Sequence, residues 1–110
     1  MLFSMSLQAI DIARNCHRSY RVVVERDLLG DCLVSLTYGR VGAAGRTIVT
    51  IARDEEHARQ ITKVALRRRA SAPRRIGVRY RPVAQFAASG WQNLSEELTK
   101  PPFHQTRSRV

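Results

Sequence analysis

Apolar and polar residues alternate along several stretches of the first half of the chain. Residues 20–26 and 32–38 place alternate apolar side chains on one face, and residues 47–52 are rich in β-branched side chains. Both features are typical of strands that bury one side. Leu7–Ile12 has a shorter alternation, which predicts a short edge strand. Because the connections are short, we expect these strands to pair antiparallel as a meander.

The hydrophobic period changes after Ala52, which predicts a helix. Asp54 can cap the first free amides, and the glutamates that follow it suit the positive end of a helix dipole. Pro73 predicts that the helix ends near Ala72. One main helix packed across an antiparallel sheet of about four to five strands is an α+β fold. The predicted buried stripe of the helix is Ala58, Ile61, Thr62, Ala65 and Leu66.

Two other segments before residue 83 have patterns of their own. Leu28 and Leu29 lie in a turn between two strands, and we expect their loop to fold back over the edge of the core. Residues 74–82 alternate Val78 and Tyr80 with arginines, which predicts a last strand with a basic outer face.

The composition becomes less regular after Val83. Asn93–Thr99 predicts a short capped helix, and Phe86 and Trp91 are the side chains expected to pin this segment to the domain. Residues 100–110 lack periodicity, which predicts a mobile tail. The expected organisation is a flexible N-terminus (1–6), one domain (7–83) and a partly disordered C-terminal extension (84–110).

The charge balance narrows the kinds of partner. The chain has 110 residues, 44% of them hydrophobic, enough for one domain with a modest core. Its formal net charge is +10, and Lys63 and Lys100 are its only lysines. Arginine binds phosphate through paired hydrogen bonds and stacks on flat groups. This excess favours nucleic acid as a partner, ahead of an anionic membrane surface.

The positive charge is concentrated after the start of the predicted helix. No acidic residue occurs between Glu56 and Glu96, whereas nine cations do. They repel one another unless an anion relieves them, which favours nucleic acid over a merely solvated basic face. Three of them recur at i, i+4 and i+8 on one side of the helix. The nine are Arg59, Lys63, Arg67, Arg68, Arg69, Arg74, Arg75, Arg79 and Arg81.

Catalytic, metal and membrane functions have little support. Cys16 and His17 are adjacent on a strand and therefore point to opposite faces, so they do not form a nucleophile–base pair. Two cysteines and three scattered histidines lack metal-ligand spacing, and no run is long enough to span a bilayer. The start of the chain lacks the basic and apolar regions of a secretion signal. We expect a cytoplasmic protein that is not an enzyme and has no cofactor.

A glycine-rich turn joins two of the predicted strands over Tyr38–Arg46. Its three glycines indicate a tight reversal, and arginines flank it. It is either a hairpin with solubilising charges or a site for a base or sugar with its phosphate. The strand period places Tyr38 with Val34 and Leu36 on the core face, whereas its position at the strand end lets the ring leave the core. Both alternatives remain open here.

The sequence Tyr-Gly-Arg-Val-Gly-x-x-Gly-Arg of this turn resembles the motif of the WGR domain, usually Trp-Gly-Arg-Val/Ile-Gly-x-x-Gly-Gln. The resemblance extends over about residues 7–82 and includes Asn15, Tyr20 and the acidic start of the predicted helix. Tyr38 stands in place of the family's Trp, and Arg46 in place of its Gln.

The resemblance implies a twisted antiparallel sheet with a helix packed across it. In poly(ADP-ribose) polymerases this domain contacts DNA near a strand end and also touches neighbouring domains. Carried over, Tyr38 would be the ring that packs on a terminal sugar, and Arg40 the guanidinium that bridges DNA and protein. From charge and position we expect Arg46 to meet backbone phosphate.

These observations predict a non-enzymatic nucleic-acid-binding module that contacts DNA backbone or ends with little sequence specificity. DNA is the predicted partner, and RNA is the alternative nucleic acid. The alternative is a protein–protein interaction module that acts with a DNA-processing partner. The predicted binding residues are Tyr38, Gly39, Arg40, Arg46, Arg59, Lys63, Arg67, Arg74, Arg75, Arg79 and Arg81.

Overall fold

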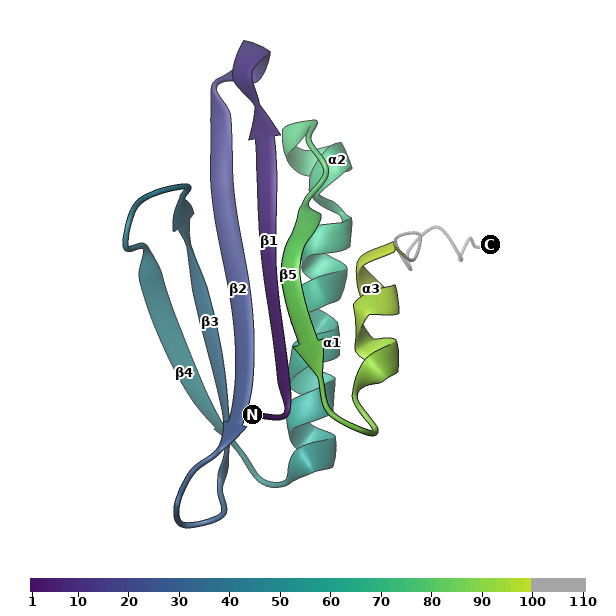
Figure 1. The fold of residues 1–110 in the computed structure, drawn as a ribbon. Coiled ribbons are helices and arrows are strands. Elements are labelled where there is room, and N and C mark those ends of the chain that lie inside the picture. The colour runs from purple at the N-terminus through teal and green to yellow at the C-terminus, as the bar shows by residue number, and fades with distance from the viewer. Residues whose placement is uncertain (100–110) are drawn as a thin grey trace.

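Five antiparallel strands form one open sheet in the order β4-β3-β2-β1-β5, in a computed structural model that describes residues 1–99 (Figure 1). The main helix, α1 (Glu55–Ala70), packs on one face of this sheet. The predicted α+β fold, with one main helix on an antiparallel sheet, is therefore confirmed. The strands are β1 (Phe3–Asp11), β2 (Cys16–Arg26), β3 (Cys32–Arg40), β4 (Arg46–Ala52) and β5 (Arg81–Ala87).

Short helical elements complete the layer on the α1 side. The α2 helix (Ala72–Ile76) follows α1 after one residue, and α3 (Glu96–Thr99) lies beside α1, as Figure 1 shows. Two 3-10 turns, η1 (Ile12–Arg14) and η2 (Gln92–Ser95), precede β2 and α3. The opposite face of the sheet carries none of these helices.

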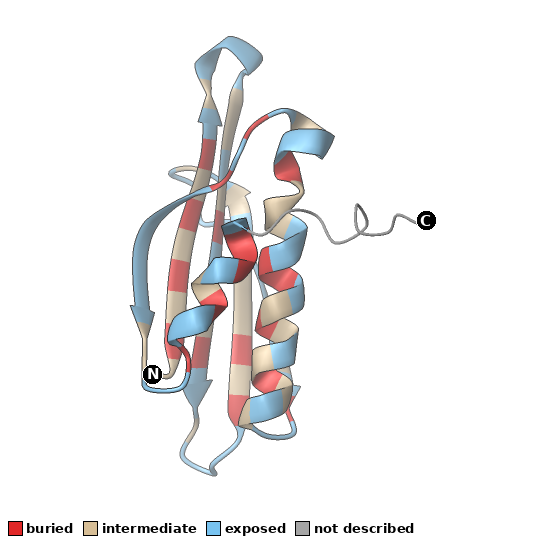
Figure 2. Cartoon of the chain, turned by 90° about the vertical axis from the view of Figure 1, so that its right-hand side faces the viewer, coloured by how far each residue is buried: buried red, intermediate tan, exposed pale blue. Residues whose placement is uncertain are grey.

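The core lies between the sheet and α1. Buried positions alternate along β1, β2 and β3 and face the buried side of α1. In Figure 2 this alternation appears as red and lighter bands along the strands. This is the period-two pattern expected for strands with one solvated face. The largest fully buried side chains include Phe3, Met5, Leu7, Val22, Val24, Val34, Leu66 and Trp91.

The start of α1 follows the sequence prediction. The Asp54 carboxylate accepts a hydrogen bond of 2.8 Å from the His57 backbone amide, and Glu55 and Glu56 lie in the first turn. His57 Nδ1 accepts a bond of 3.0 Å from the Arg53 amide, so the histidine is held locally. Of the predicted stripe, all except the half-buried Ile61 are buried.

The first strand differs from its prediction. We expected a short edge strand over Leu7–Ile12, whereas β1 starts at Phe3 and is paired on both sides, with β2 and with β5. Residues 3–6, expected in a flexible N-terminus, form the first part of this strand. Phe3 and Met5 are buried there, and burial of two large apolar side chains accounts for the longer strand.

The last strand was predicted at the wrong place. Residues 72–76 form α2, with Pro73 in its first turn, where a missing amide costs little, and Gly77 ends it in the left-handed conformation at φ 79°. The strand follows only at Arg81 and extends to Ala87, into the expected C-terminal extension. Pro82 stands beside a register shift against β1, which suits an edge strand.

The loop between β2 and β3 does not cover the core. Leu28 and Leu29 are exposed, against the prediction. The Asp27 carboxylate accepts bonds of 2.9 Å from the amides of Leu29 and Asp31, so a local polar turn determines the path of this loop.

The C-terminal segment is fixed by one of the two aromatic side chains that were predicted to pin it. Trp91 is buried, with its ring 6.0 Å from that of Phe3, whereas Phe86 is half exposed on β5 and does not pin the segment. The helix predicted over Asn93–Thr99 corresponds to η2 and α3. The predicted tail, residues 100–110, lies outside the described residues. Within the described part of the chain, no helix is long and apolar enough to cross a membrane.

Candidate nucleic-acid interface

The β3–β4 hairpin is narrow because two of its glycines touch. A Cβ atom on Gly39 would lie 2.8 Å from the Gly45 Cα, and one on Gly45 would lie 2.7 Å from the Tyr38 carbonyl oxygen. Gly45 and Gly42 also have positive φ, at 76° and 87°. These glycines therefore have a structural role, which is the close approach and the turn geometry.

The register of the sheet brings the side chains around this hairpin into two rows. Tyr38 on β3 is paired with Tyr20 on β2 and with Arg46 on β4. In the next row Arg18 on β2 is directly opposite Arg40 on β3. Because side chains alternate along strands, all five are on the face that α1 packs against.

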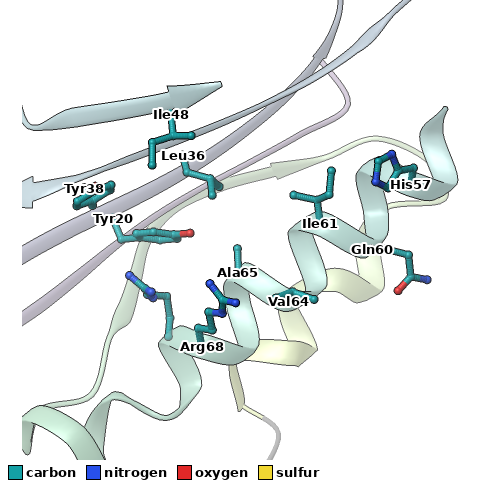
Figure 3. Close-up of a pocket in the computed structure, with 11 residues that line it drawn as sticks. Tyr20, Leu36, Tyr38, Ile48, His57, Gln60, Ile61, Val64, Ala65 and Arg68 are labelled. Atoms are coloured by element: carbon teal, nitrogen blue, oxygen red, sulfur yellow. The ribbon is translucent and has the colours of Figure 1, made fainter. Parts of the chain in front are cut away.

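The Tyr38 ring is neither buried in the core nor fully outside it. Tyr38 shares the strand face of the buried Val34, as its period predicts, yet 37% of it is exposed. Figure 3 shows its ring next to that of Tyr20, at the end of the sheet and beyond the side chains of α1 that cover Leu36. Both sequence alternatives are thus partly correct: the ring is on the core face, opposite the buried Tyr20, but at the exposed margin of the core.

A polar hollow opens at this end of the molecule, which we call the hairpin-end basin. It has a volume of about 560 Å³ and is formed by the start of β2, the end of β3 and the last turns of α1 and α2. Its lining includes Tyr38, Gly39 and Arg40 from the motif. The other lining residues are Arg14, Asn15, Cys16, His17, Arg18, Ser19, Arg69, Ile76 and Tyr80.

The basin has four arginines and no acidic side chain in its lining. Among the described residues, the only ion pair of these four is between Arg14 and Asp11, at 3.5 Å and largely exposed. Arg18 and Arg40 are both exposed and opposite one another, an arrangement of like charges that destabilises a sheet. An anion bound between them would remove this repulsion.

Arg69 is the arginine that joins α1 to the sheet. Its guanidinium carbon lies 4.3 Å from the centre of the Tyr20 ring and 5.9 Å from that of Tyr80. Its Nε is buried without a hydrogen-bond partner among the described residues. Burial raises the pKa of the Tyr20 hydroxyl, an effect that the positive charges of Arg69 and Arg68 oppose.

A second hollow, the helix groove, lies between α1 and the β3–β4 hairpin and has a volume of about 520 Å³. Figure 3 shows Leu36 and Ile48 of the sheet across from Ile61 and Val64 of α1. Tyr38 and Arg69 line both this groove and the hairpin-end basin. The remaining lining residues are Tyr20, His57, Gln60, Ala65 and Arg68.

Two of the three cations predicted on one side of α1 have partners within the protein. Arg59 bonds to Glu55, Glu56 and the Gly90 carbonyl, and lies 5.0 Å from the centre of the Trp91 ring. Arg67 pairs with the buried Glu97 at 2.8 Å. Lys63 lies between them on the same helix face and is half-buried. This side of α1 thus holds the C-terminal segment.

The remaining predicted cations come from the segment after α1. Arg74, Arg79 and Arg81 line a third hollow, described below, whereas Arg75 bonds to the Ser71 hydroxyl and the Arg68 carbonyl within the protein. The structure therefore brings Tyr38, Gly39 and Arg40 together in one basin, whereas Arg59 and Arg67 of α1 are held by partners elsewhere in the protein.

Sequence reasoning missed several residues of the basin. Arg14 and Arg18 flank the left-handed turn residue Asn15, and the β1–β2 pairing carries them to the hairpin end. Arg14 also lies over Gly77, where a Cβ would be 2.9 Å from the guanidinium. The one available signal for Arg18 was its position two residues before Tyr20, because residues two apart on a strand share a face. Arg69 was counted among the nine cations but not among the predicted binding residues.

Metal and thiol chemistry have no focus in the described part of the chain. No group of three histidine, cysteine or acidic side chains is arranged to hold a metal ion among residues 1–99. Cys32 is buried in the core, and the Cys16 thiol donates to the Ala9 carbonyl at 3.5 Å.

These features define a small α+β domain whose sheet end carries an exposed ring and converging arginines. The chain belongs to the WGR domain family, whose model matches residues 3–71. The module occurs in poly(ADP-ribose) polymerases that bind damaged DNA, and it is non-catalytic in the proteins where it is known. No curated protein and no solved structure matches the chain.

Proposed function

We propose that this protein binds DNA through the hairpin-end basin, contacting backbone and strand ends with little sequence specificity. The observation that carries the proposal is the pairing of Arg18 opposite Arg40, beside the exposed Tyr38 ring and without an acidic side chain in the basin. A phosphate between two guanidiniums forms charge-assisted hydrogen bonds with both.

The ring and the cations suit different parts of one nucleotide. Tyr38 presents a partly exposed flat surface at the rim of the basin, on which a sugar or terminal base can pack. Arg40 and Arg18 lie one row further along the strands, where they meet the adjoining phosphate. Arg46, opposite Tyr38 on β4, extends the positive surface along the hairpin. Contacts of this kind position a protein on DNA but do not specify bases.

The salt dependence of duplex binding tests this proposal. Each phosphate neutralised on duplex DNA contributes about −0.9 to the slope of log affinity against log salt. Three contacts in the basin would give a slope of roughly −2.7, or a loss of about forty-fold between 50 and 200 mM salt. Fluorescence anisotropy with a blunt duplex measures it. A slope near zero would refute the electrostatic basis of the proposal.

A matched charge control is available on the other face of the sheet. Arg21 is exposed on β2 and, by strand alternation, points away from the basin. Arg40→Ala and Arg21→Ala remove the same charge, so general attraction predicts equal losses. The proposal predicts that only Arg40→Ala reduces both the affinity and the salt slope.

The helix groove supports a second candidate function, which is docking of a protein partner. Ile48 and Val64 are exposed at its two walls, and Arg68 and Arg69 add a positive end to a mostly apolar lining. An apolar segment with an acidic residue would fit this chemistry. A pull-down after nuclease treatment separates the two functions, and Val64→Lys tests the groove. A partner that survives nuclease and is lost with Val64→Lys favours docking.

A further inference from the structure

A third hollow lies on the β5 side of α1, and we call it the arginine pocket. It has a volume of about 620 Å³. All its lining residues except Arg69 and Ala70 lie beyond residues 3–71, which the family model matches. It is formed by the end of α1, α2, the approach to β5 and α3. The lining consists of Arg69, Ala70, Pro73, Arg74, Arg79, Tyr80, Arg81, Pro82, Leu98 and Thr99.

The charge of this pocket is uncompensated. Arg74, Arg79 and Arg81 are exposed, and their guanidiniums have no ion pair or hydrogen bond within residues 1–99. The lining contains no acidic side chain. Tyr80, which is buried, lies between Arg79 and Arg81 in the sequence. Its burial therefore fixes the backbone from which both arginines extend. Such a group of cations around one hollow suits an anionic ligand.

The arginine pocket and the hairpin-end basin share two residues, Arg69 and Tyr80. Arg69 is anchored on the aromatic rings and has a buried Nε that lacks a partner in the described residues. The two hollows are therefore neighbours on either side of one wall. A polyanion that leaves the basin past Arg69 would next meet the arginine pocket.

The size of the pocket selects the form of nucleic acid. A hollow of about 620 Å³ falls within the roughly 300–1,000 Å³ range of small-molecule sites. It accommodates about one or two nucleotides and excludes a double helix. Pro73, Pro82 and Leu98 give apolar wall beside the cations, which suits the sugar and base of an unpaired nucleotide.

We propose that the arginine pocket binds a single-stranded DNA extension of a duplex whose end is held at the hairpin-end basin. This inference rests on the proposed function, because it takes the duplex end to be bound beside Tyr38 and Arg40. Single strands bind through backbone phosphates and through stacking, and the pocket offers groups for both. The protein should therefore prefer a duplex with an overhang to a blunt one.

The experiment compares three labelled DNA probes with the same duplex sequence: one blunt, one with a 3′ overhang of about six nucleotides and one with a 5′ overhang of that length. Affinities are measured by anisotropy with the full chain at several salt concentrations. At least one overhang should bind on the order of tenfold tighter than the blunt duplex. Its salt slope should be steeper by about 0.7 for each additional phosphate contacted.

Variants test whether the higher affinity for the overhang comes from the arginine pocket. R79A/R81A should abolish the preference for the overhang and leave affinity for the blunt duplex unchanged. R21A/R53A removes two exposed arginines elsewhere and should keep the preference. Thermal unfolding of each variant confirms folding. A variant that fails to fold is replaced by R79Q/R81Q, which removes the charges but keeps a polar side chain at each position.

The outcomes separate this inference from the proposed function. Equal binding of blunt and overhang probes, with Arg40→Ala still weakening both, overturns the inference and leaves DNA binding intact. Loss of blunt-duplex binding in R79A/R81A overturns it as well, because the pocket would then act on the duplex. Competition by an acidic peptide as effective as the overhang, at equal charge, would also overturn it. No binding to any probe would refute both proposals.

Discussion

The guanidinium carbon of Arg69, in the last turn of α1, lies 4.3 Å from the centre of the Tyr20 ring on β2. Arg69 lines all three hollows, whereas Tyr20 is buried at the wall of the helix groove. The contact ties the end of the helix to the end of the sheet. The position of this arginine thus depends on packing against a core aromatic ring, and not only on charge.

The burial of Tyr20 predicts a loss of stability at alkaline pH. Burial raises the pKa of the Tyr20 hydroxyl, so the unfolded chain releases this proton at lower pH than the folded chain. The contribution is complete below about pH 10 and is lost as the pH rises through the folded pKa. Urea unfolding between pH 8 and 11.5 should show a steeper fall in the free energy of unfolding for wild type than for Tyr20→Phe. Tyr38→Phe is the matched control and should resemble wild type.

Glu55, in the first turn of α1, connects this helix to the end of β2 and to the C-terminal segment. Its carboxylate pairs with Arg26 and Arg59 and accepts a hydrogen bond of 3.3 Å from the Trp91 indole. The bonds from Arg26 and Trp91 hold the pKa of Glu55 below its usual value. Its contribution to stability is therefore present above about pH 4.3 and lost as the pH falls through the folded pKa.

Substitution of this carboxylate should weaken the acid dependence of unfolding. Glu55→Gln should show a shallower decline in the free energy of unfolding between pH 5 and 3 than wild type. Unfolding is measured by the fluorescence of Trp91, the only tryptophan of the chain. Glu25→Gln, exposed on β2, is the control. Identical acid profiles for Glu55→Gln and wild type would contradict the role given to this carboxylate.

The contact between Gly39 and Gly45 predicts a large effect of a single methyl group. Gly39→Ala places a Cβ 2.8 Å from the Gly45 Cα, and either strand must move, at a cost on the order of 2–3 kcal/mol. Gly42→Ala meets open space and costs about 1 kcal/mol through its positive φ alone. Chemical denaturation of both variants gives the comparison. A smaller loss for Gly39→Ala than for Gly42→Ala would show that the hairpin opens readily.

The basin predicts a preference for DNA ends. Tyr38→Ala and Arg40→Ala should each weaken binding to a linear duplex by roughly tenfold, because a ring and a charge-assisted contact are lost. Binding to a closed circle of equal length should change less, since it has no terminal sugar for the ring. Arg21→Ala provides the charge control. An equal loss on linear and circular DNA would leave general charge attraction as the whole effect.

The local patterns predicted much of the fold. The alternation around Val22 and Val34 located the central strands, and the cap at Asp54 located the start of α1, because these features depend on near neighbours in sequence. The last strand was misplaced since Val78 and Tyr80 alternate with arginines but are buried outside any strand. The start of β5 at Arg81 is determined by its pairing with β1 at the edge of the sheet, which is an interaction between segments far apart in the sequence.

The candidate site was predictable only in its centre. The glycine motif located Tyr38 and Arg40, whereas Arg18 joined them through the β2–β3 register. Arg59 and Arg67 shared a basic helix face in sequence, but α3 and its neighbouring turns pack against that face and supply partners for both. A charge run cannot indicate that Arg67 meets Glu97 or that Arg59 bonds to the Gly90 carbonyl, because these partners come from distant segments.

The sequence by itself determined that the chain forms an antiparallel sheet with one capped helix, that it is strongly basic, and that a ring and arginines flank a glycine-rich hairpin. Tertiary structure decided which cations remain available to a ligand. Strand register placed Arg18 opposite Arg40, and helix packing placed Arg69 over Tyr20 between two basic hollows. The physical reason is that propensity and hydrophobic period act over a few residues, whereas the convergence of charges depends on pairing between segments far apart in the chain.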